Sequence, residues 1–132
     1  MDFKEKTEGV SFRRAAAYHF STMILFLRIA FVVVLISMFA VTGWASTEVA
    51  LWKTPRAVAT HPWFIATLFD TYFAFLTFYA WLAYKETALL ARVGWLLGIL
   101  LLGNIAMATY MLIQLFRLPL TAKVEDLILR RK

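Results

Sequence analysis

The sequence predicts an all-α integral membrane protein with three transmembrane helices in a small antiparallel bundle. Hydrophobic residues make up 62% of the 132 residues, and charged residues only 17%. Soluble domains average roughly 45–50% apolar residues even with glycine included, so this excess excludes an ordinary soluble fold. The charged residues also leave three runs that are nearly or fully uncharged, each close to the roughly 20 residues that a helix needs to cross a bilayer. We therefore treat residues 1–132 as a single membrane domain.

The three runs predict the transmembrane helices in chain order. The first covers about residues 20–44 and contains one charged residue, Arg28, about two turns from its start. The second covers about 63–84 and contains one charged residue, Asp70. The third, 93–116, is uncharged throughout. Proline is costly inside a helix, and all three prolines fall outside these runs, at Pro55, Pro62 and Pro119.

The basic residues give the expected orientation. With three crossings, the 14 Lys and Arg residues divide seven against seven between the two sides. The first helix usually dominates orientation, and more basic residues lie at its N-terminal end than in the loop that follows. We therefore predict a multi-pass protein of the plasma or inner membrane with a cytoplasmic N-terminus. Arg13 and Arg14, just before the first span, are expected to meet lipid head groups.

The chain after the third span leaves two alternatives open. Residues 121–130 place Val124, Leu127 and Ile128 on one helical face, with Thr121 as a candidate N-cap. This pattern favours a short helix at the membrane interface or docked on a partner. The alternative is a charged tail without regular structure.

Asp70 is the leading candidate for a functional residue, because ionisable groups inside a membrane are costly. Steps of three and four residues place Thr67, Ala74 and Thr77 beside it on a polar, small-residue stripe, which we expect to face inward or line a cavity. Its carboxylate can serve as a proton or cation site, or it can hold helices in register through hydrogen bonds. Arg28 has a simpler interpretation, because its long side chain can reach the cytoplasmic interface.

The third run carries the residues expected at a helix-packing surface. Gly94 and Gly98 have the small-xxx-small spacing that lets helices approach closely, and Gly103 follows. Asn104 lies near the predicted midplane and needs a hydrogen-bonding partner there. We expect that partner on the Asp70 face.

The second and third runs resemble a known family. The segment from His61 to Phe116 contains a W-x-A-Y-K-E signature, formed by Trp81, Ala83, Tyr84, Lys85 and Glu86, and its final span ends in Q-L-F. It resembles a family of small multi-pass membrane proteins of unknown function from plants and bacteria. The resemblance implies a membrane architecture and assigns no catalytic residue. The second predicted span ends at these signature residues. Four of them are candidates for contact with head groups or a partner: Trp81, Tyr84, Lys85 and Glu86.

Several functional classes find no support in the sequence. There is no cysteine, and His19 and His61 fall on opposite predicted membrane faces, so no metal site is predicted and no cofactor is assigned. No nucleotide-binding or hydrolase motif occurs, and the net charge of +6 suits anionic lipids better than nucleic acid in so apolar a chain. We predict a non-enzymatic accessory or assembly subunit, or a small homo-oligomer, embedded in the bilayer. The alternative is a small transporter, channel or lipid-active enzyme that uses Asp70.

Overall fold

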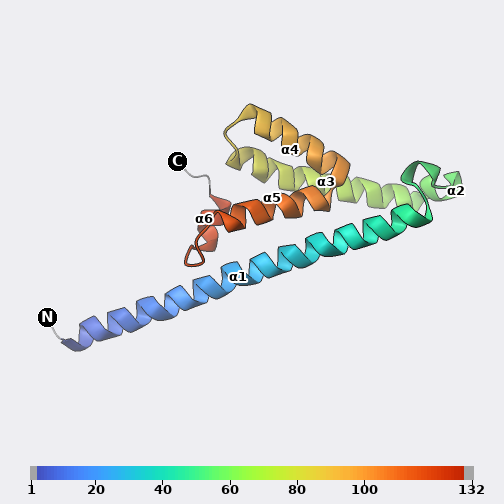
Figure 1. Ribbon diagram of the computed structural model, residues 1–132. Helices are drawn as coiled ribbons and strands as arrows, with labels where there is room; N and C mark the ends of the chain where they lie inside the picture. Colours follow the sequence, from blue (N-terminus) through green and yellow to red (C-terminus); the bar gives the residue numbers. More distant parts are fainter. Residues whose placement is uncertain (1–2, 130–132) are drawn as a thin grey trace.

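The computed structural model describes the backbone of residues 3–129 and the side chains of residues 21–129, and these residues form an all-α chain without strands (Figure 1). The predicted all-α class is therefore confirmed. In chain order the helices are α1 (Phe3–Glu48), the one-turn 3-10 helix η1 (Leu51–Lys53), α2 (Arg56–Ala59), α3 (Pro62–Lys85), α4 (Leu89–Leu102), α5 (Asn104–Phe116) and α6 (Val124–Ile128).

Two helices are long and apolar enough to cross a membrane. They are the segment Ser21–Glu48 of α1, with 28 residues, and α3, with 24 residues. At 1.5 Å per residue these lengths correspond to about 42 and 36 Å, and a hydrocarbon core is about 30 Å thick. Both helices lie where the sequence predicts the first two spans, and α3 begins with Pro62 at a position where proline costs no hydrogen bond.

The third uncharged run differs from the prediction, because it forms two helices instead of one. α4 has 14 residues and α5 has 13, which correspond to about 21 and 20 Å. Gly103 separates them with φ +55° and ψ −126°, a conformation that side chains with a Cβ rarely adopt. A Cβ at Gly103 would also lie 2.7 Å from Cζ of Phe75. The chain therefore reverses at Gly103, and a continuous helix over 93–116 is absent.

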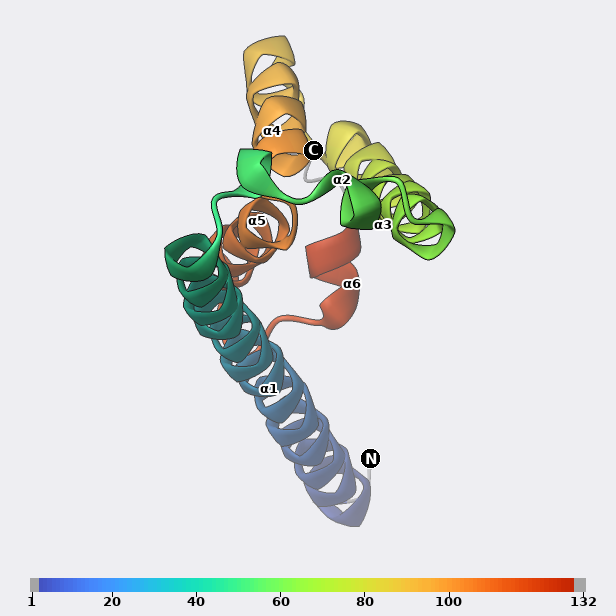
Figure 2. The same ribbon diagram turned by 90° about the vertical axis from the view of Figure 1, so that its right-hand side faces the viewer.

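α5 lies at the centre of the arrangement, with α1 on one side and α3 and α4 on the other (Figure 2). Its two faces build two separate cores. The core shared with α1 and α6 consists of Ile24, Leu115, Leu118, Ala122 and Leu127. The core shared with α3 and α4 consists of Phe75, Leu82, Ile99, Ala106 and Tyr110.

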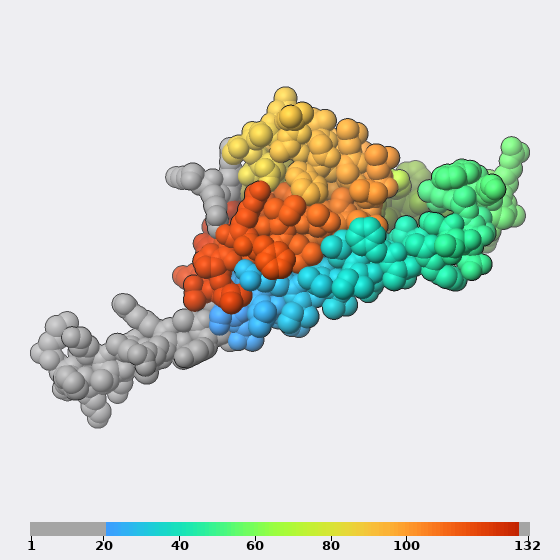
Figure 3. All heavy atoms as spheres, viewed as in Figure 1, coloured from blue at the N-terminus to red at the C-terminus, as the bar shows by residue number. Residues whose placement is uncertain are grey.

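The α4–α5 hairpin covers only part of the two long helices. Its tip at Gly103 lies against Phe75, which is ten residues, or about 15 Å, before the end of α3 at Lys85. The hairpin thus reaches about halfway along α3. Figures 1 and 3 show that the C-terminal end of α1 and the N-terminal end of α3, which η1 and α2 join, extend beyond the hairpin.

Candidate functional site

The Asp70 face of α3, defined by Thr67, Asp70, Ala74 and Thr77, lies on the outside of the chain. All four side chains are exposed. The two threonine hydroxyls donate to carbonyls four residues earlier in α3, at 2.8 and 2.9 Å. The carboxylate of Asp70 has no hydrogen bond or ion pair with any described residue. This placement differs from the inward-facing stripe that the sequence predicts.

The outward placement of the Asp70 face has a physical cause. α3 turns a larger aromatic and aliphatic surface toward α4 and α5, with Phe75 and Leu82 buried and Phe78 and Tyr79 partly buried. Burying these side chains removes far more apolar area than burying the small residues around Asp70 would. The apolar face therefore fills the core beside Ala74 and Thr77. Thr67 and Asp70 lie beyond the hairpin tip at Phe75, where residues 62–70 of α3 are exposed except for Phe64.

Asn104 lies at the tip of the α4–α5 hairpin, at the first position of α5. Its side chain is exposed and has no hydrogen bond with the described residues. The predicted hydrogen bond between Asn104 and the Asp70 face is not made in the described chain. Both polar groups thus face outward separately.

Arg28 binds the end of α5. Its Nη2 donates to the carbonyl oxygens of Leu115, at 3.0 Å, and Leu118, at 2.7 Å. The guanidinium carbon also lies 5.0 Å from the ring centroid of Phe116. A cation is favoured at a helix C-terminus, where carbonyl groups lack helical partners. The sequence instead predicts that Arg28 reaches toward the interface near Arg14. The side chains of Arg13 and Arg14 lie outside the described residues, so their expected head-group contacts have no structural account.

The end of α3 holds the C-terminal helix α6. The indole Nε1 of Trp81 donates to the carbonyl oxygen of Ile128 at 3.1 Å, and Nζ of Lys85 donates to the carbonyl oxygen of Leu127. The ammonium group also lies 5.5 Å from the Trp81 ring centroid. Two residues of the W-x-A-Y-K-E signature, which we expected to contact lipid head groups or a partner, thus bind the C-terminal segment of the same chain.

Glu86 links α3 to α5 and α4. Its Oε1 accepts hydrogen bonds from the hydroxyl of Tyr110, at 2.9 Å, and from Nε2 of Gln114, at 3.3 Å. Its carbonyl oxygen accepts one from Nε of Arg92 at 2.9 Å. Sequence reasoning missed Tyr110 as a partner, although Tyr110 and Gln114 are four residues apart and so share a helix face. Among the four signature residues singled out above, only Tyr84 is exposed.

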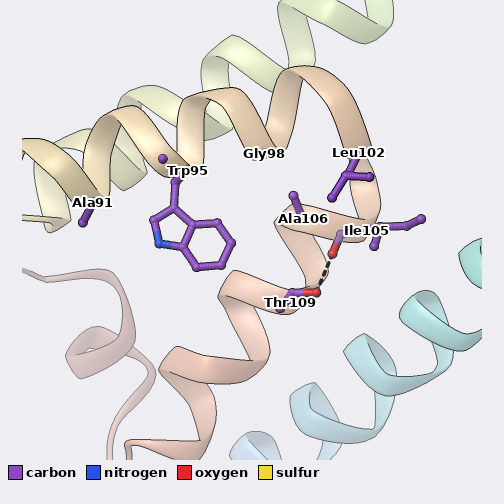
Figure 4. A pocket seen from close by; sticks show the side chains of 8 residues that line it. Ala91, Trp95, Gly98, Leu102, Ile105, Ala106 and Thr109 are labelled. Atoms are coloured by element: carbon purple, nitrogen blue, oxygen red, sulfur yellow. Dashed lines mark hydrogen bonds between the residues drawn. The ribbon is translucent and has the colours of Figure 1, made fainter.

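The predicted packing glycines of α4 line an open groove between α4 and α5. A Cβ at Gly94 would have no neighbour within 4 Å, and one at Gly98 would meet only Cβ of Ala106, at 3.7 Å. The α4–α5 groove has a volume of about 390 Å³ (Figure 4). It is lined by Ala91, Gly94, Trp95, Gly98, Leu102, Ile105, Ala106 and Thr109. These glycines therefore create space at the surface of the chain, whereas Gly103 packs tightly against Phe75.

The described residues contain no group of three or more His, Asp or Glu side chains placed to hold a metal ion.

Comparison with known proteins identifies the family of the chain. No curated protein and no solved structure is significantly similar to the chain. The model of a family described as protein of unknown function, DUF1475, matches residues 7–131, and the chain therefore belongs to the DUF1475 family.

Proposed function

We propose that the chain is a non-catalytic subunit of a membrane assembly, and that the Asp70 face of α3 meets a neighbouring transmembrane helix. The supporting observation is the exposed carboxylate of Asp70, which has no partner in the described chain. It lies eight residues from the start of α3, or about 12 Å along a helix that is long enough to cross the bilayer.

The cost of such a carboxylate supports a covered surface. An unpaired acidic side chain near the centre of a membrane helix costs about 2.5–3.5 kcal/mol on insertion scales. A neighbouring helix that supplies hydrogen-bond donors lowers this cost. Thr67, Ala74 and Thr77 are small, so they let another backbone approach closely, as is common where membrane helices pack.

The helix arrangement supports a topology for this subunit with two crossings. α1 from Ser21 onward and α3 cross the membrane, and the α4–α5 hairpin enters and leaves from one side. Both termini then lie on that side, together with all 14 Lys and Arg residues except Lys53 and Arg56. The seven-against-seven division of a three-span chain is thus replaced by a strong asymmetry. The side rich in basic residues is normally cytoplasmic, so we infer cytoplasmic termini.

The assembly role is tested by measuring mass in mild detergent. We expect the purified protein, or the complex extracted with it, to have a protein mass well above that of one chain. Asp70→Ala should weaken association about three- to twentyfold, because a hydrogen bond between membrane helices contributes about 0.6–1.7 kcal/mol. Asp70→Asn should weaken it less, because the amide oxygen still accepts a hydrogen bond. Light scattering coupled to size-exclusion chromatography gives both the mass and its concentration dependence.

The matched control is Glu125→Gln, which removes another exposed acidic group at α6, away from the Asp70 face. It should leave the mass unchanged. A wild-type chain that is monomeric and without partners at all concentrations would contradict the proposal.

A second function is favoured by the break at Gly103. Helices that end within the membrane occur at the ion and substrate sites of transporters. In a transporter or channel of this kind, Asp70 would be the proton or cation site. Asp70→Asn would then abolish flux in reconstituted vesicles and leave the assembly mass intact, which is the reverse of the result expected above.

A further inference from the structure

We propose that the α4–α5 groove binds one acyl chain of a glycerophospholipid from the leaflet on the side of α6. The inference rests on the membrane location of the chain and is independent of the assembly role of the Asp70 face.

The length of the groove fits one leaflet. It extends from Ala91, near the start of α4, to Leu102, beside the hairpin tip. Eleven residues along a helix correspond to about 16.5 Å, and half of a hydrocarbon core is about 15 Å. One end of the groove therefore opens near the membrane surface and the other ends near the midplane.

The volume and lining of the groove favour a single chain over a helix. About 390 Å³ falls within the range of roughly 300–1,000 Å³ seen for small-molecule sites. A helix about 10 Å wide and 16.5 Å long occupies more than about 1,000 Å³. The hydroxyl of Thr109 already donates to the carbonyl oxygen of Ile105 at 2.7 Å, so the wall presents almost entirely apolar groups to an occupant.

Trp95 supplies a polar contact at the right place. Its ring packs edge-on against Tyr110, with centroids 5.1 Å apart, which fixes its orientation. Figure 4 shows the indole nitrogen on the side of the ring toward Ala91, the surface end of the groove. This N–H has no hydrogen bond with any described residue. Tryptophan indoles are enriched at membrane interfaces, where a lipid ester carbonyl can accept such a bond.

The test uses photo-crosslinking in vesicles. The full chain is reconstituted in phosphatidylcholine and phosphatidylglycerol vesicles containing a small fraction of phosphatidylcholine with a diazirine in one acyl chain. After irradiation, mass spectrometry of peptides locates the crosslinks. We expect them to concentrate between residues 91 and 109.

The variants separate the groove from the rest of the surface. Gly94→Leu places a side chain in the groove without a clash at Cβ and should lower the crosslink yield there at least fivefold. Trp95→Phe keeps a ring but removes the N–H and should lower it about threefold. The matched control Gly43→Leu, at an open glycine of α1, should change nothing.

Three results would overturn the proposal. The first is equal labelling of wild type and Gly94→Leu, or crosslinks spread along α1 and α3. The second is equally strong groove labelling by a diazirine fatty acid, which would identify a free fatty acid as the occupant. The third is disulfide formation between copies of Gly98→Cys in the otherwise cysteine-free chain, which would identify a second copy. Oligomer mass is measured separately, so failure here does not decide the role of Asp70.

Discussion

At the scale of single residues, Arg28 is a charged residue inside a predicted span. The structure explains its position by the hydrogen bonds that its guanidinium donates to the end of α5. The sequence shows that Arg28 is a charged residue in an apolar run. It does not show which groups accept its hydrogen bonds, because Leu115 and Leu118 lie far along the chain and accept through their backbone carbonyls. No pattern of side chains marks a helix end as the binding site of a distant arginine. Asp70 shows the opposite case, since its type and position are evident in the sequence but its outward direction depends on the packing of α3.

Replacing Arg28 should lower the stability of the protein. Arg28→Met keeps a long apolar stem but removes both hydrogen bonds to the end of α5 and the contact with Phe116. Because a hydrogen bond from a charged group contributes about 1.5–3 kcal/mol, we expect a loss of about 2–4 kcal/mol for the pair after partial compensation. Thermal unfolding in detergent measures the change. Arg56→Met, at an exposed position in α2, is the control; equal melting temperatures for the two variants would contradict this role of Arg28.

At the scale of elements, the sequence predicts α3 and the apolar part of α1 well because their runs are long and their limits are marked by charges and prolines. It does not predict the division of the third run. Glycine is common in membrane helices, so Gly103 alone does not end one. The adjoining Asn104 was the available signal, because a glycine–asparagine pair is typical of turns. The decisive contact, between Gly103 and the ring of Phe75, belongs to the tertiary structure.

Substitution of Gly103 tests the hairpin. Gly103→Ala combines an unfavourable positive φ with a Cβ 2.7 Å from Phe75, and we expect a loss of about 1–3 kcal/mol in thermal unfolding. Adding Phe75→Leu should restore the stability that Gly103→Ala loses through the contact with the ring. It should not restore the stability lost through the positive φ at residue 103. Gly43→Ala, inside α1 with open space around it, should be neutral or stabilising because alanine is the better helix former. If Gly103→Ala is as stable as wild type, the break at Gly103 is wrong.

At the scale of the whole molecule, the number of crossings decides where the C-terminal segment lies. The absence of native cysteine makes single-cysteine variants directly usable. In intact cells, Thr60→Cys in the loop between α1 and α3 should react with a membrane-impermeant maleimide. Glu125→Cys in α6 should react only after the membrane is permeabilised, because the two crossings proposed above would return the chain to the side of the N-terminus. Labelling of Glu125→Cys in intact cells would instead support a third crossing.

The reversal at Gly103 also changes what the cell must do to insert this protein. In the proposed topology, only residues 49–61 have to be carried through the bilayer, with Lys53 and Arg56 as their basic residues. α1 and α3 cross as two successive helices, and α5 separates most of their length. The α4–α5 hairpin can then insert as a closed unit after synthesis of α3 is finished, since neither of its ends leaves the cytoplasm. In this topology, most charged residues therefore need not cross the bilayer during insertion.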